Sequence, residues 1–128
     1  MTMPAASGNA SRAMHFAVTD LAATWLRSAG FEDAAPRPYH AKISDALDEG
    51  VLGPDVRGIS GVHLRVSTRG SFRLGGDLDD ARRAAALSNR GEVAALLQLR
   101  RGGSAIAESF VLVTLEDFAR LLGGTPPP

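Results

Sequence analysis

The pattern of apolar and polar positions divides the chain into eight segments with helical or extended periodicity. Apolar residues recur every three to four positions over 16–29, which predicts a helix that ends at Gly30. This spacing also places Trp25 on the apolar face, so we expect its ring in the core. Residues 36–43 predict an edge strand, because Pro36 and Pro38 lack the backbone N–H groups that a central strand donates to its neighbours. Residues 44–55 indicate an acidic turn or a short helix.

Two strands are predicted next, over 55–59 and 61–70, with a tight turn or a bulge at Ser60-Gly61. In the second strand, valine and leucine alternate with a polar set formed by His63, Arg65, Ser67 and Arg69. Strict alternation is typical of a half-buried strand. We therefore expect a solvated polar face, with His63 partly exposed.

The second half of the chain predicts a strand–helix–strand unit followed by a strand and a helix. An alanine-rich helix over 78–89 follows Asp77, a good N-cap residue, and the apolar run Val93–Leu99 is typical of a strand covered on both faces. A further strand is predicted over 109–115, and Thr114 should cap a helix that ends at Gly123. The whole order predicts an α/β fold.

Length and composition favour one folded domain in a chain of 128 residues, 45% of them hydrophobic. We expect this domain over 15–123, with flexible tails over 1–14 and 124–128. Because there is no cysteine, disulfides, thiolate metal sites and cysteine nucleophiles are excluded. The first 14 residues lack the features of a signal peptide, and no apolar run reaches the length of a membrane span, so we expect a cytoplasmic protein.

The charge is balanced overall but uneven along the chain. Residues 57–101 carry nine basic and four acidic side chains, a surplus of five positive charges. A basic surface of this kind suits contact with nucleic-acid phosphates, although a solvated strand face explains it about equally well. The candidate DNA-binding residues are Arg57, Arg69, Arg73, Arg100 and Arg101.

The order of elements and several local motifs resemble the PD-(D/E)XK nuclease superfamily. The segment "GPDVRGISGVHLRVS" resembles the part of that family in which an aspartate, a short turn and a strand with Glu-x-Lys follow one another. The pieces "GGDLDDARRAA", "LLQLRRG" and "SFVLVTLEDFARLL" are similar to small Holliday-junction-resolvase-like nucleases of actinobacterial phages. The resemblance covers about residues 17–122 and implies a restriction-endonuclease-like αβββαβ core with an extra strand and a C-terminal helix.

The resemblance also implies roles for individual residues. Family members hold Mg²⁺ with acidic side chains, and Asp55 stands at the position of the first aspartate, with Asp20 as a supporting carboxylate. The family's glutamate and lysine fall on Arg65 and Ser67. Replacing an anionic ligand by a cation should abolish metal affinity, and Arg65 could pair with Asp55 instead.

Three functions follow from this departure. The first is a catalytically degenerate DNA-binding homologue that needs no cofactor and that, by resemblance, forms a homodimer. The second is an active Mg²⁺-dependent, structure-specific DNA endonuclease with relocated groups, for example Asp20, Asp55 and either Asp77 or Asp79 as metal ligands, with Arg65 in place of the lysine. The third is a protein–protein assembly module of a phage or mobile element, in which the fold is only a scaffold.

Overall fold

A five-stranded mixed sheet with the strand order β1-β2-β3-β4-β5 forms the centre of the chain. The structure is a computed structural model that describes residues 4–38, 53–68, 73–100 and 105–128. Its elements are α1 (Pro4–Ser28), β1 (Ala35–Pro36), β2 (Val56–Arg57), β3 (Val62–Ser67), α3 (Leu74–Ser88), β4 (Val93–Gln98), the 3₁₀ turn η1 (Ile106–Glu108), β5 (Phe110–Leu112) and α4 (Leu115–Leu121). The predicted mixed α/β architecture is confirmed, and the described elements follow the predicted order. The parts of the predicted edge strand and acidic segment that fall on residues 39–52 lie outside the described residues.

The pairing of the strands follows from their connections. The chain turns back between β1, β2 and β3, which pair antiparallel, whereas α3 carries the chain across the sheet so that β3 and β4 run parallel. β5 returns antiparallel to β4 and forms one edge of the sheet. The predicted hairpin before β3 is confirmed, with a four-residue turn over 58–61.

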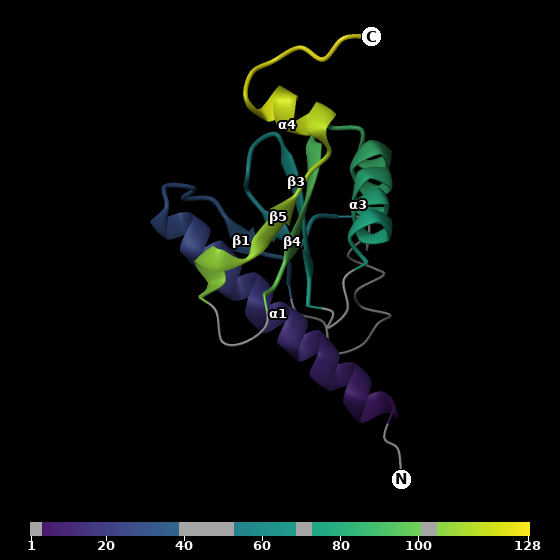
Figure 1. Ribbon diagram of the computed structural model, residues 1–128. Coiled ribbons are helices and arrows are strands. Elements are labelled where there is room, and N and C mark those ends of the chain that lie inside the picture. The colour runs from purple at the N-terminus through teal and green to yellow at the C-terminus, as the bar shows by residue number, and fades with distance from the viewer. Residues whose placement is uncertain (1–3, 39–52, 69–72, 101–104) are drawn as a thin grey trace.

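The main core lies between α1 and one face of the sheet (Figure 1). Val18, Ala22 and Ala23 on α1 are buried against alternate residues of β3 and β4, such as Leu64 and Leu97. The small alanines bring the helix close to the sheet. Every residue of β4 is buried, so the prediction of a strand covered on both faces is confirmed.

The polar face of β3 is covered by α3, which corrects one prediction from the sequence. Alanines 81 and 85 of α3 pack on Ala94, and the short side chains let the helix lie over β3 and β4. His63 is consequently fully buried rather than partly exposed. Its burial lowers its pKa, and its Nδ1 atom lies 3.9 Å from Glu92 Oε1.

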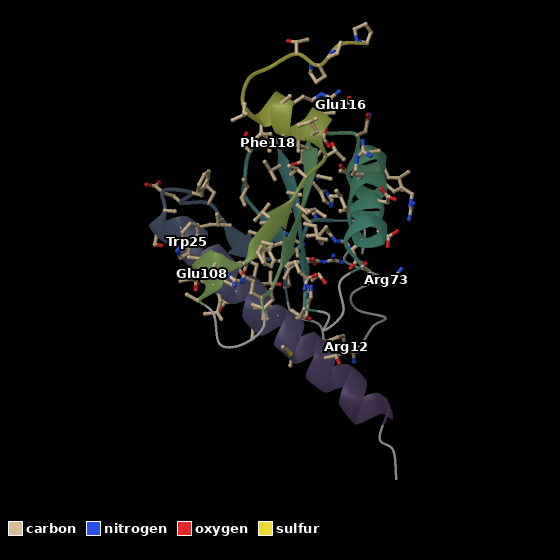
Figure 2. The ribbon with its side chains drawn as sticks, in the orientation of Figure 1. Arg12, Trp25, Arg73, Glu108, Glu116 and Phe118 are labelled. Atoms are coloured by element: carbon tan, nitrogen blue, oxygen red, sulfur yellow. The ribbon has the colours of Figure 1, made fainter. Side chains whose placement is uncertain are left out.

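Two predictions about α1 also differ from the structure. The helix begins at Pro4, inside the segment for which a tail was predicted, and proline suits this position because the first helical N–H has no partner to lose. Trp25, labelled in Figure 2, is 45% exposed and does not belong to the core, whereas Ala22 and Leu26 of the same helix pack in it. Gly30 does end the helix, with a φ of 109°.

The two later helices differ in how well their starts were predicted. α3 begins at Leu74, so Asp77 lies in its first turn and is not the N-cap. In α4 the predicted cap is confirmed, because Thr114 Oγ1 accepts a hydrogen bond of 3.1 Å from the Asp117 N–H. Gly123, with a φ of 87°, follows the end of α4 as predicted.

Within the described residues, the helices are too short or too polar to cross a membrane.

Candidate functional site

An open cleft of about 510 Å³ lies beside the carboxyl end of β3, between the first half of α1 and the start of α3. Its polar lining combines three arginines, one histidine and three carboxylates with several hydroxyl groups. These residues are Ser11, Arg12, His15, Thr19, Arg37, Asp55, Arg65, Ser67, Thr68, Asp77 and Asp80. Three of the four residues predicted for a nuclease-like centre, Asp55, Arg65 and Ser67, are therefore brought to one cleft.

Asp55 is fixed at the floor of this cleft by the pairing of the strands. Its backbone N–H donates to Leu64 O at 2.9 Å, and its backbone carbonyl accepts from the Arg37 N–H at 2.7 Å. The carboxylate is buried, and its Oδ2 atom accepts a 2.7 Å hydrogen bond from the Val66 N–H. The backbone of β3 thus holds a negative charge at a defined point of the sheet.

His15 of α1 is the second member of the site. Its Nε2 atom lies 2.9 Å from Val66 O and 3.5 Å from Asp55 Oδ2. Because both neighbours are acceptors, Nε2 must carry a proton and donate it. The backbone of one residue, Val66, thus contacts both side chains: its N–H donates to Asp55 and its carbonyl accepts from His15.

This arrangement shifts both pKa values in opposite directions. The hydrogen bond and the charge of Asp55 outweigh the burial of His15 and raise its pKa above 6.5. Burial of Asp55 alone would raise its pKa, but contact with His15, the Val66 N–H and the charge of Arg65 together lower it below 3.8. The pair is therefore held in its ionised form, His⁺ beside carboxylate, over a wider pH range than either group alone.

Arg65 completes a cluster of three charged groups. Its Nε atom lies 3.6 Å from Asp55 Oδ2, and its side chain is 29% exposed. The ion pair between neighbouring strands that the sequence predicted is therefore present. The guanidinium lies beside the carboxylate to which the resemblance assigns metal binding, and it also borders the open cleft.

Of the remaining predicted acids, only Asp77 lies at the same cleft as Asp55. Asp20 is exposed on α1 and does not line the cleft, whereas Asp77 lines it and Asp79 lies beside a separate hollow near Glu92. Over 4–38, 53–68, 73–100 and 105–128, no three histidine or acidic side chains form a group suited to a metal ion. The structure thus gives no support to Asp20, Asp55 and Asp77 or Asp79 as a joint set of metal ligands.

The basic residues predicted to bind DNA lie in different places. Arg73 is exposed directly before α3, and Figure 2 shows it on the same side of the molecule as Arg12. Arg57 is exposed at the end of β2, outside the cleft lining. Arg100 follows β4, and its guanidinium lies 5.1 Å from the ring centre of Phe110. Arg69 and Arg101 lie outside the described residues.

Sequence reasoning missed three basic residues of the cleft, His15, Arg12 and Arg37. A signal for His15 exists in the chain, because His15, Thr19 and Ala22 follow helical spacing and extend the buried face of α1 by one turn. Nothing comparable marks Arg12 or Arg37, which reach the cleft through the tertiary arrangement of α1 and of the segment after β1.

Comparisons of the chain with protein-family models, with curated proteins and with solved structures find no match.

Proposed function

We propose that the cleft beside Asp55 binds the phosphate backbone of DNA, duplex or branched, and that the chain is a nuclease-like protein without metal-dependent cleavage. The observation that carries this proposal is the contact between Arg65 and Asp55, at 3.6 Å. An arginine at this place supplies a fixed positive charge where a nuclease would bind a dication. The protein would accordingly need no metal cofactor for binding.

The charge balance around Asp55 supports the loss of metal binding. One carboxylate already interacts with two cationic side chains, Arg65 and His15, and with one backbone N–H. A hard dication would have to displace these partners and would then face the two positive charges at a distance of a few ångströms. Binding of Mg²⁺ at Asp55 would therefore be strongly opposed.

The other basic groups at the cleft support contact with phosphates. Arg12 and Arg37 line the cleft together with Arg65, and Arg73 is exposed on the same side of the molecule as Arg12 (Figure 2). Arginine binds phosphate oxygens through two parallel N–H groups, which fixes the position of a nucleic-acid backbone without reading its sequence. The acids Asp77 and Asp80 at the same cleft limit the strength of this attraction and favour a shape-selective mode of binding.

The test is DNA binding measured by fluorescence anisotropy, with duplex and four-way-junction DNA, over a series of salt concentrations. We expect the logarithm of the binding constant to fall linearly with the logarithm of the salt concentration. The Arg73→Ala variant should weaken binding and reduce the slope by about 0.9, the amount that corresponds to one lost phosphate contact.

Arg90→Ala is the matched control, because Arg90 is equally an exposed arginine but follows the opposite end of α3. It should leave the slope unchanged. The proposal fails if the wild-type chain has negligible affinity at modest salt, or if its affinity does not depend on salt. That outcome would favour the alternative of a protein–protein assembly module.

A further inference from the structure

A second surface of the molecule gathers large apolar side chains on the edge strand β5 and the helix that follows it. Six of them are between 47% and 83% exposed, far from the usual burial of such residues. They are Phe110, Val111, Leu115, Phe118, Leu121 and Leu122. β5 leads directly into α4, so that the six form one continuous segment of the chain, which we call the β5–α4 patch (Figure 1).

The size of this patch sets it apart from ordinary surface residues. Each of the six side chains exposes on the order of 100 Å², which gives on the order of 600 Å² for one copy of the chain. Alternation along β5 places Phe110 and Val111 on opposite faces of the sheet, so this sum is an upper limit for one continuous area; the largest apolar patches of monomeric proteins reach about 300–600 Å². Two copies that cover these side chains completely would bury at most about 1,200 Å², the lower end of the range for stable interfaces.

The backbone of β5 is open to a further strand. β5 pairs with β4 on one side only, and the described residues place no strand on its other side. β5 is short, with three residues, but its phenylalanine, valine and leucine include neither the charged residues nor the proline that often block an exposed edge. An antiparallel partner would therefore gain both backbone hydrogen bonds and apolar contacts.

The charged residues of α4 do not interfere with such a contact. Asp117 interacts with Arg82 of α3 at 3.8 Å and with Arg120 at 2.7 Å, and Arg120 also contacts Glu116. The helix thus pairs its charges with one another and with α3. Because Glu116, Asp117 and Arg120 each have a partner, an interface at the patch would bury no unpaired charge from these three residues.

We propose that the β5–α4 patch is a two-fold interface between two copies of this chain, in which β5 pairs antiparallel with its own copy. An antiparallel strand pair is compatible with a two-fold axis, because each residue of one strand meets its equivalent across the axis. An axis beside Val111, the central residue of β5, places Val111 opposite its copy and Phe110 opposite Leu112. The interface is independent of the DNA-binding cleft.

Sedimentation equilibrium of the full chain over a range of concentrations tests this surface, because it measures the mass of the protein in solution. The wild-type chain should have the mass of two chains, and Val111→Lys should reduce it to one, because lysine blocks an edge strand. Leu115→Lys should act in the same way, and since Leu115 is 83% exposed this change leaves the fold intact. Circular dichroism checks the fold of each variant.

Leu21→Lys is the matched control, because Leu21 is 56% exposed on α1 and does not belong to the patch. This variant should remain a dimer. A wild-type monomer at the highest concentration, or a dimer that survives both patch substitutions, overturns the proposal. A dimer that dissociates with Leu21→Lys also overturns it, since α1 would then carry the contact.

The absence of cysteine permits a direct test of the geometry. Paired residues of antiparallel strands have Cα atoms about 4.5–5.5 Å apart, within the range of about 4.4–6.8 Å that a disulfide spans. Val111→Cys should therefore form a covalent dimer on mild oxidation, whereas Leu21→Cys should not. Equal cross-linking of both variants, or none for Val111→Cys, contradicts the proposed pairing.

Discussion

At the scale of single residues, the backbone of Val66 organises the candidate site. Its N–H and carbonyl hold Asp55 and His15, and Arg65 on the same strand adds the second positive charge. The sequence predicted Asp55 and Arg65 because they follow a recognisable strand motif. It did not predict His15, because α1 is longer than its clearest apolar repeat and the contact joins residues 51 positions apart.

The opposite pKa shifts predict how stability depends on pH. Since the folded state raises the pKa of His15, this group stabilises the fold below pH 6.5, and the contribution is lost as the pH rises through the raised value. Since the folded state lowers the pKa of Asp55, its contribution is present above pH 3.8 and is lost as the pH falls through the lowered value. The pair should therefore stabilise most between these two limits.

Urea unfolding of the wild-type chain and of His15→Gln over this pH range measures the effect. We expect the free energy of unfolding to differ by on the order of 1 kcal/mol or less, because the ion pair is partly exposed. The difference should be largest between pH 3.8 and 6.5 and shrink above it. Protonation of buried His63 destabilises both proteins below pH 6.5 and cancels in the comparison. A difference that grows above pH 6.5 contradicts the pairing.

At the scale of elements, apolar periodicity predicted the order of helices and strands because each pattern is local. The buried run of β4 and the cap at Thr114 are examples in which the residues themselves define the element. The burial of His63 is different, because alternation along β3 indicates which residues share a face but not what covers that face. His63 is buried because the small alanines of α3 allow this helix to pack closely on that face of the sheet.

The hairpin between β2 and β3 offers a test of packing at this scale. Gly58 has a φ of 83°, and a Cβ atom at this position would lie 1.9 Å from the backbone oxygen of Asp33. Gly58→Ala therefore combines an unfavourable backbone conformation with a clash against a backbone atom. We expect a clear loss in the free energy of unfolding, measured by urea denaturation.

Gly61 in the same turn separates the two effects. Its φ of 78° is similar, but a Cβ atom there would meet nothing within 4 Å. Gly61→Ala should cost about 1–2 kcal/mol for the left-handed conformation alone. Gly58→Ala should cost about 1–3 kcal/mol more, the usual range for an added methyl group without space. Equal losses for the two variants would show that the segment at Asp33 moves aside.

At the scale of the whole molecule, the cleft and the β5–α4 patch are formed by different elements. The cleft lies between α1 and α3 at one end of β3, whereas the patch follows β5 into α4 (Figure 1). This separation would let two copies associate as proposed while the cleft stays open for the proposed contact with DNA. Charge distribution along the sequence indicated a basic surface, but the arginines and acids from α1, β3 and α3 that meet at the cleft are brought together only by the fold.

The most direct test of the central claim is a nicking assay on branched and linear duplex DNA with Mg²⁺ or Mn²⁺. A known metal-dependent endonuclease serves as the positive control, and Asp55→Asn as the matched variant. Because Arg65 and His15 surround the carboxylate at Asp55, we predict that the wild-type chain nicks neither DNA, with either metal. Metal-dependent nicking by the wild-type chain that disappears in Asp55→Asn would contradict the account.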